Sequence, residues 1–408
     1  MSDPRASTAP PGTVLFLGFW GVHDPLTTAT ILPGIGVLHD RLHVPRVVLG
    51  TVERGHFAPL EMDGVEHLPW RASERLPRVL ARSIDHLGHV RQLVRAVRRE
   101  KVRLIIARAS TAGSFGYSVS RITGVPLVVE SFEPHADYMA DCGEWDRGSI
   151  IYLLSRRMEQ RQIQRALALI TVSRSYHDHL LEEGVDPERV MVAPCPVDMA
   201  RVRSSPEDRS RLRASIGATH HIVGVYAGKF GGMYHDRTAF EVFTRTARHL
   251  HDRFKLVVLT PEPKDRVEEG LRAAGFPMAD ALVQRVPHDE VPAWLSAADL
   301  AFALYKRTTT SQYLSPVKVG EYWACGLPVL LTEGVADDGG IITGEGIGGA
   351  VFDPMKEEVG DAVDRALAAL RDDHSRERIR SLATRHRSIE ATVRAYRGVF
   401  GLLERRKA

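Results

Sequence analysis

Residues Ser315–Val329 read SPVKVGEYWACGLPV, and this stretch decides what kind of fold the chain forms. Ser315 and Pro316 are suited to begin a helix, because serine caps helix N-termini and proline is well tolerated in the first turn. Gly326 ends the helix, and the residues after it lead into a buried strand. The pattern predicts a helix followed by a strand, the repeating unit of a Rossmann-like sheet.

The start of this predicted helix is suited to bind an anion. Helix N-termini concentrate unpaired N–H groups and partial positive charge, so a diphosphate can sit there. Lys318 and Glu321 lie one turn apart just inside the helix. A glutamate in that place can accept hydrogen bonds from both hydroxyl groups of a ribose. Each residue alone fits an ordinary helix and strand equally well, so the prediction of a nucleotide site rests on their combination.

The rest of the chain predicts two similar α/β domains. Its 408 residues are too many for one ordinary core and suit two domains of about 150–200 residues each. Short aliphatic runs alternate with helical patterns, which is typical of βα units and parallel sheets. We therefore expect two Rossmann-like, doubly wound domains that face an interdomain cleft, where ligands of such sheets bind. The predicted strands are Val14–Gly18, Arg46–Gly50, Leu104–Arg108, Leu127–Glu130, Leu169–Val172, Val190–Ala193, Ile222–Ala227, Lys255–Thr260, Leu282–Val286, Leu300–Leu304, Val329–Thr332 and Ala350–Phe352.

We expect the chain to divide into four parts. Residues 1–12 are small, polar and rich in proline, which predicts a disordered tail. Residues 13–197 and 198–385 form the two Rossmann-like domains, joined near the segment Pro194–Asp198. Residues 386–408 predict a C-terminal helix that packs back towards the N-terminal domain.

Composition and charge exclude several classes of protein. The net charge of +3 is too small to suggest a nucleic-acid partner. The cysteines Cys142, Cys195 and Cys325 are far apart, which excludes a disulfide scaffold or a zinc ribbon and suits a reducing cytosol. No apolar run reaches the roughly 18 residues of a transmembrane helix, and the first residues lack the apolar core of a signal peptide. We expect a cytoplasmic protein, for which contact with the inner face of the membrane stays open.

The region Arg71–Arg103 is strongly basic, and much of it has helical periodicity. Two interpretations of it remain open. It is a solvated outer helix face, or it is a peripheral surface that meets anionic lipid or a phosphorylated acceptor.

The motif SPVKVGEYWACGLPV resembles the donor-binding motif of retaining glycosyltransferases of the family 4 type, also called glycosyl transferases group 1, which have the GT-B fold. Thr171–Asp198 looks like the end of the first domain in that family. Val286–Leu304 looks like its base-side loop, helix and strand, which implies that Val286 and His288 lie near the base. The resemblance extends over nearly the whole chain, from Val14 to Tyr396.

The resemblance also implies the roles of residues in the motif itself. In the family, a glutamate in this context binds the ribose, which corresponds to Glu321. Backbone amides just upstream hold the diphosphate and the sugar, which corresponds to the loop of Leu314, Ser315 and Pro316. An acidic residue often stands eight positions before the ribose glutamate and contacts the transferred sugar. Here that position is Tyr313, so sugar recognition differs or another group serves.

The first loop of the C-terminal domain, YAGKFGGMYHDR at Tyr226–Arg237, departs from the family as well. The family places an arginine and a lysine on the diphosphate. Lys229 occupies the arginine position and still offers a point charge, whereas Tyr234 falls where the lysine would be. Arg237 and Lys318 are the candidates to replace the missing cation. The glycines that allow the backbone of this loop to approach phosphate are Gly228, Gly231 and Gly232.

Two loops of the N-terminal domain are predicted to face the acceptor. The loop GFWGVHDP after the first strand contains Gly18 and Gly21, which permit tight turns. The segment ESFEPHADYM offers Glu133 and His135, and in the family a histidine after this strand contacts the donor sugar, which corresponds to His135. Glu133 is an alternative contact for an acceptor hydroxyl. Arg108, at the end of a strand, is a candidate to bind an anionic acceptor group.

The resemblance implies a retaining glycosyltransferase of the hexosyltransferase type. It would move a sugar from a UDP-, GDP- or dTDP-sugar to a saccharide, lipid-linked or natural-product acceptor. The chain has no Asp-x-Asp pair of the metal-dependent type, so a metal is not expected to be required. Two alternatives stay open: a nucleotide-sugar epimerase of the same fold, and a non-catalytic binding or regulatory subunit.

Overall fold

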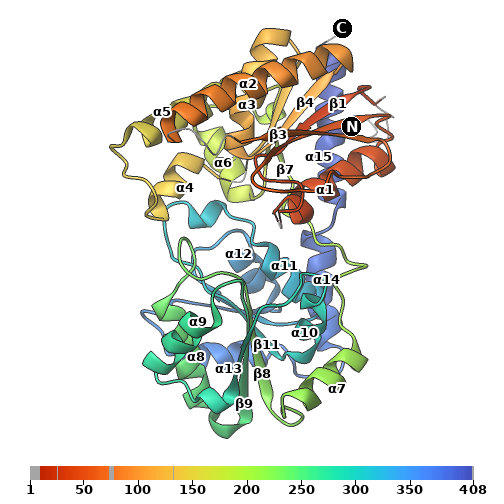
Figure 1. The fold of residues 1–408 in the computed structure, drawn as a ribbon. Helices are drawn as coiled ribbons and strands as arrows, with labels where there is room; N and C mark the ends of the chain where they lie inside the picture. Colours follow the sequence, from red (N-terminus) through yellow and green to blue (C-terminus); the bar gives the residue numbers. More distant parts are fainter. Residues whose placement is uncertain (1–9, 25, 73–77, 132, 407–408) are drawn as a thin grey trace. The chain divides into compact units, whose positions relative to one another are not determined.

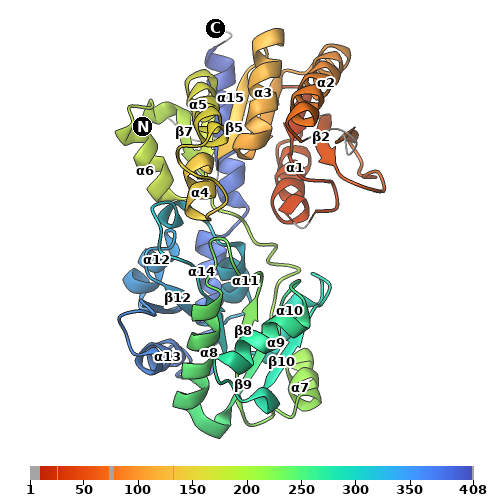
Figure 2. The same ribbon diagram turned by 60° about the vertical axis from the view of Figure 1, so that its left-hand side comes forward.

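The computed structural model describes residues 10–24, 26–72, 78–131 and 133–406, and only the backbone of residues 78–84. The chain forms two compact units, whose elements are labelled in Figure 1 and Figure 2. The first unit comprises the residues up to Tyr138, Trp145–Pro194 and Ile389–Ala408, and the second comprises Met139–Glu144 and Cys195–Ser388. The boundaries expected at residues 197 and 385 stay predictions, and residues 1–9 of the expected tail lie outside the described residues.

The first unit contains a seven-stranded parallel sheet in the order β3-β2-β1-β4-β5-β6-β7. Its inner strands are aliphatic and buried, as expected for a parallel sheet that is covered on both faces. The strands are β1 (Val14–Leu17), β2 (Val47–Glu53), β3 (Val65–Arg71), β4 (Leu104–Arg108), β5 (Leu127–Ser131), β6 (Ala168–Thr171) and β7 (Val190–Val192).

Strand β3 is absent from the strands predicted above. Its sequence, VEHLPWR, combines polar residues with Pro69 and therefore lacks an aliphatic run. The strand lies at the edge of the sheet and pairs only with β2 among the described strands. An edge strand tolerates proline because one of its sides donates no ladder hydrogen bonds.

Helices cover both faces of this sheet. Helices α2, α3 and α5 are neighbours on one face, and α15 packs with η2 on the other. The helical segments are η1 (Thr27–Ile31), α1 (Leu32–Gly36), η2 (Val37–Arg41), α2 (Arg78–Arg99), α3 (Ala109–Thr123), α4 (His135–Asp141), α5 (Ile150–Arg165), α6 (Arg174–Glu182), η3 (Pro187–Arg189) and α15 (Glu390–Arg405).

A buried polar triad ties the C-terminal helix α15 to this sheet. Tyr396 of α15 donates a hydrogen bond to Glu130 of β5 at 2.6 Å, and Arg108 of β4 pairs with the other carboxylate oxygen at 2.8 Å. All three side chains are buried. Arg108 therefore serves the core of the unit, which corrects its interpretation as a contact for an anionic acceptor.

His89 of α2 is a second buried polar group in this unit. Its ring stacks on Trp70 with centroids 5.5 Å apart and lies 4.6 Å from the ring of Phe115. Neither ring nitrogen has a hydrogen-bond partner among the described residues. Burial, with a smaller contribution from His86, lowers the pKa of His89 to about 4. The fold therefore holds this imidazole neutral.

This burial predicts a stability that depends on pH. An unfolded histidine protonates near pH 6.5, so below that pH the unfolded chain binds a proton that the folded chain refuses until about pH 4. Stability is therefore fully present above about pH 6.5 and is lost as the pH falls towards 4. Between pH 7.5 and 5 we expect His89 to contribute a loss of roughly 2 kcal/mol, measured by urea denaturation as the difference between wild type and a variant without this imidazole. His89→Phe should flatten this dependence, whereas His220→Gln, at an exposed position, should leave it unchanged.

The second unit contains a six-stranded parallel sheet in the order β10-β9-β8-β11-β12-β13. The first six strands of the first unit are arranged in the same order, which is that of a doubly wound Rossmann sheet. The two predicted sheets are thus confirmed. The strands are β8 (Ile222–Ala227), β9 (Phe254–Leu259), β10 (Ala281–Gln284), β11 (Leu300–Ala303), β12 (Val329–Thr332) and β13 (Gly349–Phe352).

Two apolar layers enclose this second sheet. One is rich in phenylalanine and lies under α8, α9 and α13, and the other lies under α7, α10, α11 and α14. The helical segments are α7 (Pro206–Ser215), α8 (Arg237–Leu250), η4 (His251–Arg253), α9 (Lys264–Ala273), η5 (Met278–Asp280), α10 (Val291–Ala297), η6 (Ser311–Tyr313), α11 (Val317–Ala324), α12 (Asp338–Glu345), α13 (Val359–Leu367) and α14 (Ser375–His386). Among the described helices of the chain, none is long and apolar enough to cross a membrane.

Candidate active site

Helix α11 lies beside the point where the strand order of the second sheet reverses, between β8 and β11. Its Tyr322 hydroxyl accepts a hydrogen bond from the backbone N–H of Ala227 at 2.9 Å, at the end of β8. On the other side, Trp323 donates to the carbonyl of Gly348 at 2.9 Å. These two buried anchors fix the rotation of α11 and leave Glu321 on the remaining, partly exposed side. Ligands of such sheets bind at this switch point.

The start of α11 corrects one prediction. Pro316 occupies the N-cap position, and no side chain caps the helix. The Ser315 hydroxyl accepts a hydrogen bond from the Cys195 N–H at 3.0 Å and another from the guanidinium of Arg387. Ser315 thus connects the loop before α11 to two segments that are distant in the sequence. Because its oxygen accepts these two hydrogen bonds, it does not cap the helix.

Arg387 is the anchor of this loop. Its guanidinium makes a bidentate ion pair with Asp338, and both side chains are almost completely buried. Burial raises the pKa of Asp338, and the positive charge of Arg387 opposes that rise. The backbone carbonyl of Arg387 also accepts a hydrogen bond from Val197 at 2.9 Å. One arginine therefore holds both the loop before α11 and the segment around Val197.

Replacing Arg387 with methionine is expected to lower the free energy of unfolding by about 3–5 kcal/mol, because Asp338 is left as an unpaired buried charge. The double variant Arg387→Met/Asp338→Leu should recover most of that loss. Arg385→Met is the matched control, since Arg385 pairs with Glu345 at the surface, and it should change stability little. Chemical denaturation measures all three. Equal losses in the single and double variants would contradict the ion-pair explanation.

Lys318 is the most unusual side chain of the site. Its amino group lies over three tyrosine rings, 4.6 Å from the centroid of Tyr226, 4.3 Å from that of Tyr234 and 5.6 Å from that of Tyr305. It has no hydrogen-bond partner among the described residues, although the side chain is about nine-tenths buried. Burial lowers the pKa of Lys318 to about 7, and the carboxylate of Glu321 acts in the opposite direction. An amine in this state can gain a proton and a partner together when an anion arrives.

The loop after β8 is shaped around this amine. A Cβ atom added to Gly228 would lie 2.5 Å from the Lys318 amino nitrogen, and Gly228 has a φ of +143°. Gly231 and Gly232 also have positive φ values, of +81° and +60°, which L-residues with side chains rarely adopt. These glycines are therefore required by the backbone. The side chain of Lys229 is exposed, and its carbonyl accepts a hydrogen bond from Tyr226.

Glu321 lies one turn after Lys318 and is largely buried. Burial raises the pKa of its carboxyl group to about 7, against the pull of Lys318 and Arg201. The Nε2 atom of His288 lies 3.8 Å from a Glu321 oxygen, and burial lowers the pKa of His288. Val286, two residues earlier, packs against the apolar core of the unit. The predicted ribose and base residues Glu321 and His288 are thus brought together.

Tyr313, at the end of η6, is buried just before the loop that leads into α11, so a bulky ring stands where the family pattern has an acid. A different acid is present nearby that sequence reasoning missed. Asp141 accepts hydrogen bonds from the N–H and the hydroxyl of Thr310, at 3.0 Å and 2.8 Å. These residues are 169 positions apart, and no motif links them. The following Leu314 packs against the core of the same unit.

His135 and Glu133 lie together in the first unit, after β5. The Nδ1 atom of His135 is 3.7 Å from a Glu133 oxygen, and the ring is T-shaped on Trp145 at 5.7 Å. Burial alone would lower the pKa of His135, but Glu133 and Glu159 together outweigh it and raise the pKa. Glu159 of α5, which sequence reasoning missed, accepts a hydrogen bond from Ala136, and burial raises its pKa to about 7. This histidine is therefore held between two carboxyl groups, those of Glu133 and Glu159.

Gly18 and Gly21 have a different role from the one predicted. Neither has a positive φ, so no turn requires them. A Cβ on Gly18 would lie 2.6 Å from Ile31, and one on Gly21 would lie 2.7 Å from a carboxylate oxygen of Glu53. They are needed for close packing of the chain on itself, and their contact with a ligand stays a prediction.

Comparison with known families identifies both units. The family model described as "Glycosyl transferase 4-like domain" matches residues 37–196, and the one described as "Glycosyl transferases group 1" matches residues 225–369. Together they span most of the chain. The protein belongs to the group 1 glycosyltransferases. Enzymes of this group transfer a sugar from a nucleotide sugar to an acceptor.

Solved structures share the fold of this glycosyltransferase. HepE of Anabaena in complex with UDP matches with a TM-score of 0.70 at 15% identity, over 94% of this chain and 98% of that chain. Sucrose-phosphate synthase from Thermosynechococcus elongatus gives 0.70 at 15% identity, over 96% and 99%. WaaG, a glycosyltransferase involved in lipopolysaccharide biosynthesis, gives 0.67 at 16%, over 91% and 95%. None of the curated proteins is a significant match. At these identities the structures establish the GT-B fold.

Proposed function

We propose that this glycosyltransferase binds a nucleoside diphosphate sugar at α11 and transfers a hexose with retention of configuration. The observation that carries the proposal is the pair of Lys318 and Glu321, one turn apart at the switch point of the second sheet. Lys318 has no hydrogen-bond partner among the described residues, and its amine reaches the glycine loop after β8. Glu321 keeps one face accessible for ribose hydroxyls.

In this proposal Lys318 replaces the cation that is missing at Tyr234. The ring of Tyr234 contacts the Lys318 amine, so the charge arrives from α11 at the place where the family has a loop lysine. Lys229, on the exposed side of the loop, supplies a second point charge to the diphosphate. The amides of the loop before α11 and the glycine loop complete the binding of phosphate.

The chemical step then follows from charge. The bond between the anomeric carbon and the diphosphate oxygen breaks, and its electron pair stays on the diphosphate. Lys318 stabilises that developing charge. The acceptor oxygen bonds to the anomeric carbon on the face that the diphosphate leaves, and its proton passes to the departing phosphate oxygen. We propose that His135 contacts the sugar and that Glu133 binds an acceptor hydroxyl.

The donor most worth testing first is UDP-glucose, because HepE, which has the same fold, was solved with UDP and with UDP-glucose. The full-length protein is incubated with UDP-, GDP- and dTDP-sugars, with and without EDTA. Thermal shift measures binding, and release of nucleoside diphosphate measures turnover. Release that increases with added saccharide or lipid-linked acceptors supports transfer. A changed sugar without release indicates an epimerase. Binding without turnover under every condition indicates a regulatory subunit, and no binding contradicts the donor site.

Helix α2 covers much of the basic region Arg71–Arg103, for which peripheral membrane contact was one of two interpretations. On the predicted apolar side of α2, Val90, Leu93, Val94 and Val97 are buried in the core, whereas Leu87 is 71% exposed. Arg91, Arg95 and Arg98 are exposed on its other side. These data favour a solvated basic face for the described part of the region Arg71–Arg103, of which residues 73–77 lie outside the described residues.

A further inference from the structure

The first turns of α5 carry a concentration of exposed aliphatic side chains. Ile150 is 76% exposed, Leu153 is 55% exposed and Leu154 is 63% exposed, and Ile151 is 36% exposed. Half of the large hydrophobic side chains that are exposed in the described parts of the chain are these four. Ile150, Leu153 and Leu154 share one helical face. We call them, with Ile151, the α5 apolar tip.

The α5 apolar tip is presented by a rigid base. Ser149 caps the helix by accepting a hydrogen bond from Tyr152. The Tyr152 ring is buried, and its hydroxyl donates to Asp137 of α4 at 2.7 Å. Arg147 pairs with the same Asp137 oxygen. Because the helix start is held this firmly, exposure of the tip is a property of the folded unit and does not come from a frayed helix end.

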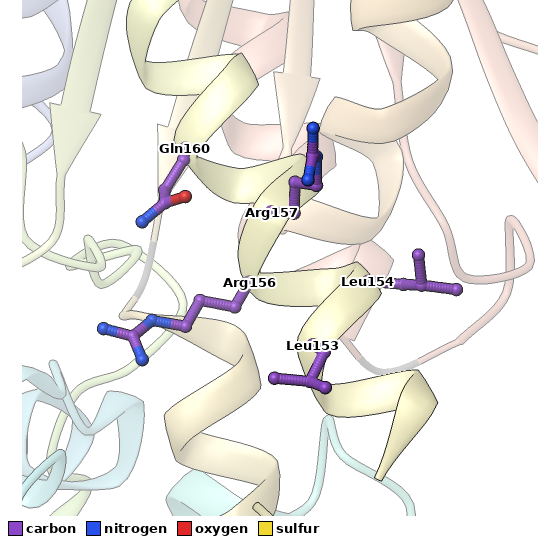
Figure 3. A pocket seen from close by; sticks show the side chains of 5 residues that line it. All are labelled: Leu153, Leu154, Arg156, Arg157 and Gln160. Carbon is purple, nitrogen blue, oxygen red and sulfur yellow. The ribbon is translucent and has the colours of Figure 1, made fainter. Parts of the chain in front are cut away.

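The tip is followed by a basic collar. In Figure 3, Arg156 projects to the same side of the helix as Leu153, whereas Leu154 projects to the opposite side. These residues, with Arg157 and Gln160, line a hollow of about 430 Å³. Arg161 and Arg165 continue the exposed side of the helix. The single acid of α5 is turned inwards, where it accepts the hydrogen bond from Ala136. The outward side of α5 is therefore apolar at its start, and the exposed residues that follow are arginines and the neutral Gln160 and Gln164, with no exposed acid.

We propose that the α5 apolar tip docks on an anionic lipid surface. Apolar residues enter the acyl boundary and arginines stay at the headgroup level in helices that bind membrane surfaces. Phosphate headgroups supply the negative charge that Arg156 and Arg157 complement. A protein partner fits less well, because four aliphatic side chains offer a few hundred Å², well short of the roughly 800 Å² per partner of a stable interface.

The α5 apolar tip lies near the edge of the first sheet that is predicted to face the acceptor. α5 leads directly into β6, so its first turns lie at the carboxyl edge of the sheet, the edge from which β5 leads to His135. A lipid surface on α5 would therefore adjoin the predicted acceptor side of this unit. A lipid-linked acceptor follows from this, and that consequence rests on the proposed function, whereas the docking itself does not.

The test uses the full-length protein and vesicles of phosphatidylcholine, alone or with about 30% phosphatidylglycerol, in a sedimentation assay. Wild type is expected to bind the anionic vesicles. Leu153→Ser/Leu154→Ser should bind at least about tenfold more weakly. Arg156→Gln/Arg157→Gln should bind roughly 25-fold more weakly, since each arginine contributes about fivefold. Met355→Ser, at a 77% exposed position in the second unit, and Arg91→Gln/Arg95→Gln in α2 are the matched controls, expected to bind as wild type.

Several results would overturn the proposal. One is wild-type protein that ignores anionic vesicles, and another is binding that survives the leucine pair but is lost with the α2 pair. A dimer that the leucine pair abolishes, in a protein that does not bind vesicles, would make the tip a protein interface. Release of nucleoside diphosphate is measured in parallel without vesicles. Vesicle binding without donor turnover would support the docking surface and contradict the proposed function. Donor turnover without vesicle binding would support the proposed function and contradict the docking surface.

Discussion

Lys318→Met is expected to lower kcat/KM by about 10²–10³-fold while leaving the thermal midpoint unchanged or higher. The loss follows because Lys318 would be removed from a leaving diphosphate inside a site of low dielectric. The unchanged or higher thermal midpoint is expected because Lys318 is enclosed by the rings of three tyrosines, which we call the tyrosine cage. The Lys318 amine is buried without a hydrogen-bond partner among the described residues, so its burial lowers the stability of the ligand-free protein. Methionine fills the same space without that cost.

The comparison of stability and activity separates a functional lysine from a structural one. Lys306→Met, in the loop that follows β11, is the control and should change neither kcat/KM nor the thermal midpoint. Because the pKa of Lys318 is about 7, the affinity of wild type for a nucleoside diphosphate should fall as the pH rises above 7, where the amine must first take up a proton. Lys318→Met should lose that pH dependence. A variant with wild-type kcat/KM, or with a lowered thermal midpoint, would refute the role.

Glu321→Ala is expected to weaken nucleotide binding by about 10²-fold. Each hydrogen bond from a ribose hydroxyl to an ionised carboxylate is worth about 1.5–3 kcal/mol, and alanine removes both. Glu321→Gln keeps one acceptor oxygen and should lose about tenfold. Glu290→Gln, an exposed glutamate just before α10, is the matched control. Calorimetry with the nucleoside diphosphate chosen by the donor panel measures these affinities.

A cycle with the 2′-deoxy nucleotide makes this test specific. If Glu321 binds the 2′-hydroxyl, wild type should prefer the ribonucleotide and Glu321→Ala should bind both forms equally. The two losses would then be strongly non-additive. A variant that still prefers the ribonucleotide by the wild-type factor would show that another residue contacts the ribose.

Local patterns in the sequence predicted much of the candidate site. Lys318 and Glu321 were recognisable because their spacing in one helix is a local property. The two Rossmann-like sheets were predictable for the same reason, since each buried strand is a short aliphatic run of its own. Strand β3 was missed because an edge strand needs no such run.

What the sequence did not reveal depends on contacts between distant segments. Ser315 looked like a helix cap, but its oxygen is engaged by Arg387, 72 residues later. The cage around Lys318 is assembled from three tyrosines, two of which come from loops after different strands. Asp141 and Glu159 belong to no motif, and only the fold brings them to Thr310 and His135. The spacing of residues along the sequence does not indicate which distant segments contact one another in the fold.

The triad of Tyr396, Glu130 and Arg108 bears on how this enzyme can be recombined. The first unit is not one continuous piece, because Ile389–Ala408 belongs to it although the second unit precedes them in the chain. A hybrid enzyme that exchanges parents only at Pro194 would join Glu130 of one parent to the last helix of another. Donor specificities should therefore be exchanged with two crossovers, and the final helix inherited together with the sheet on which it was selected.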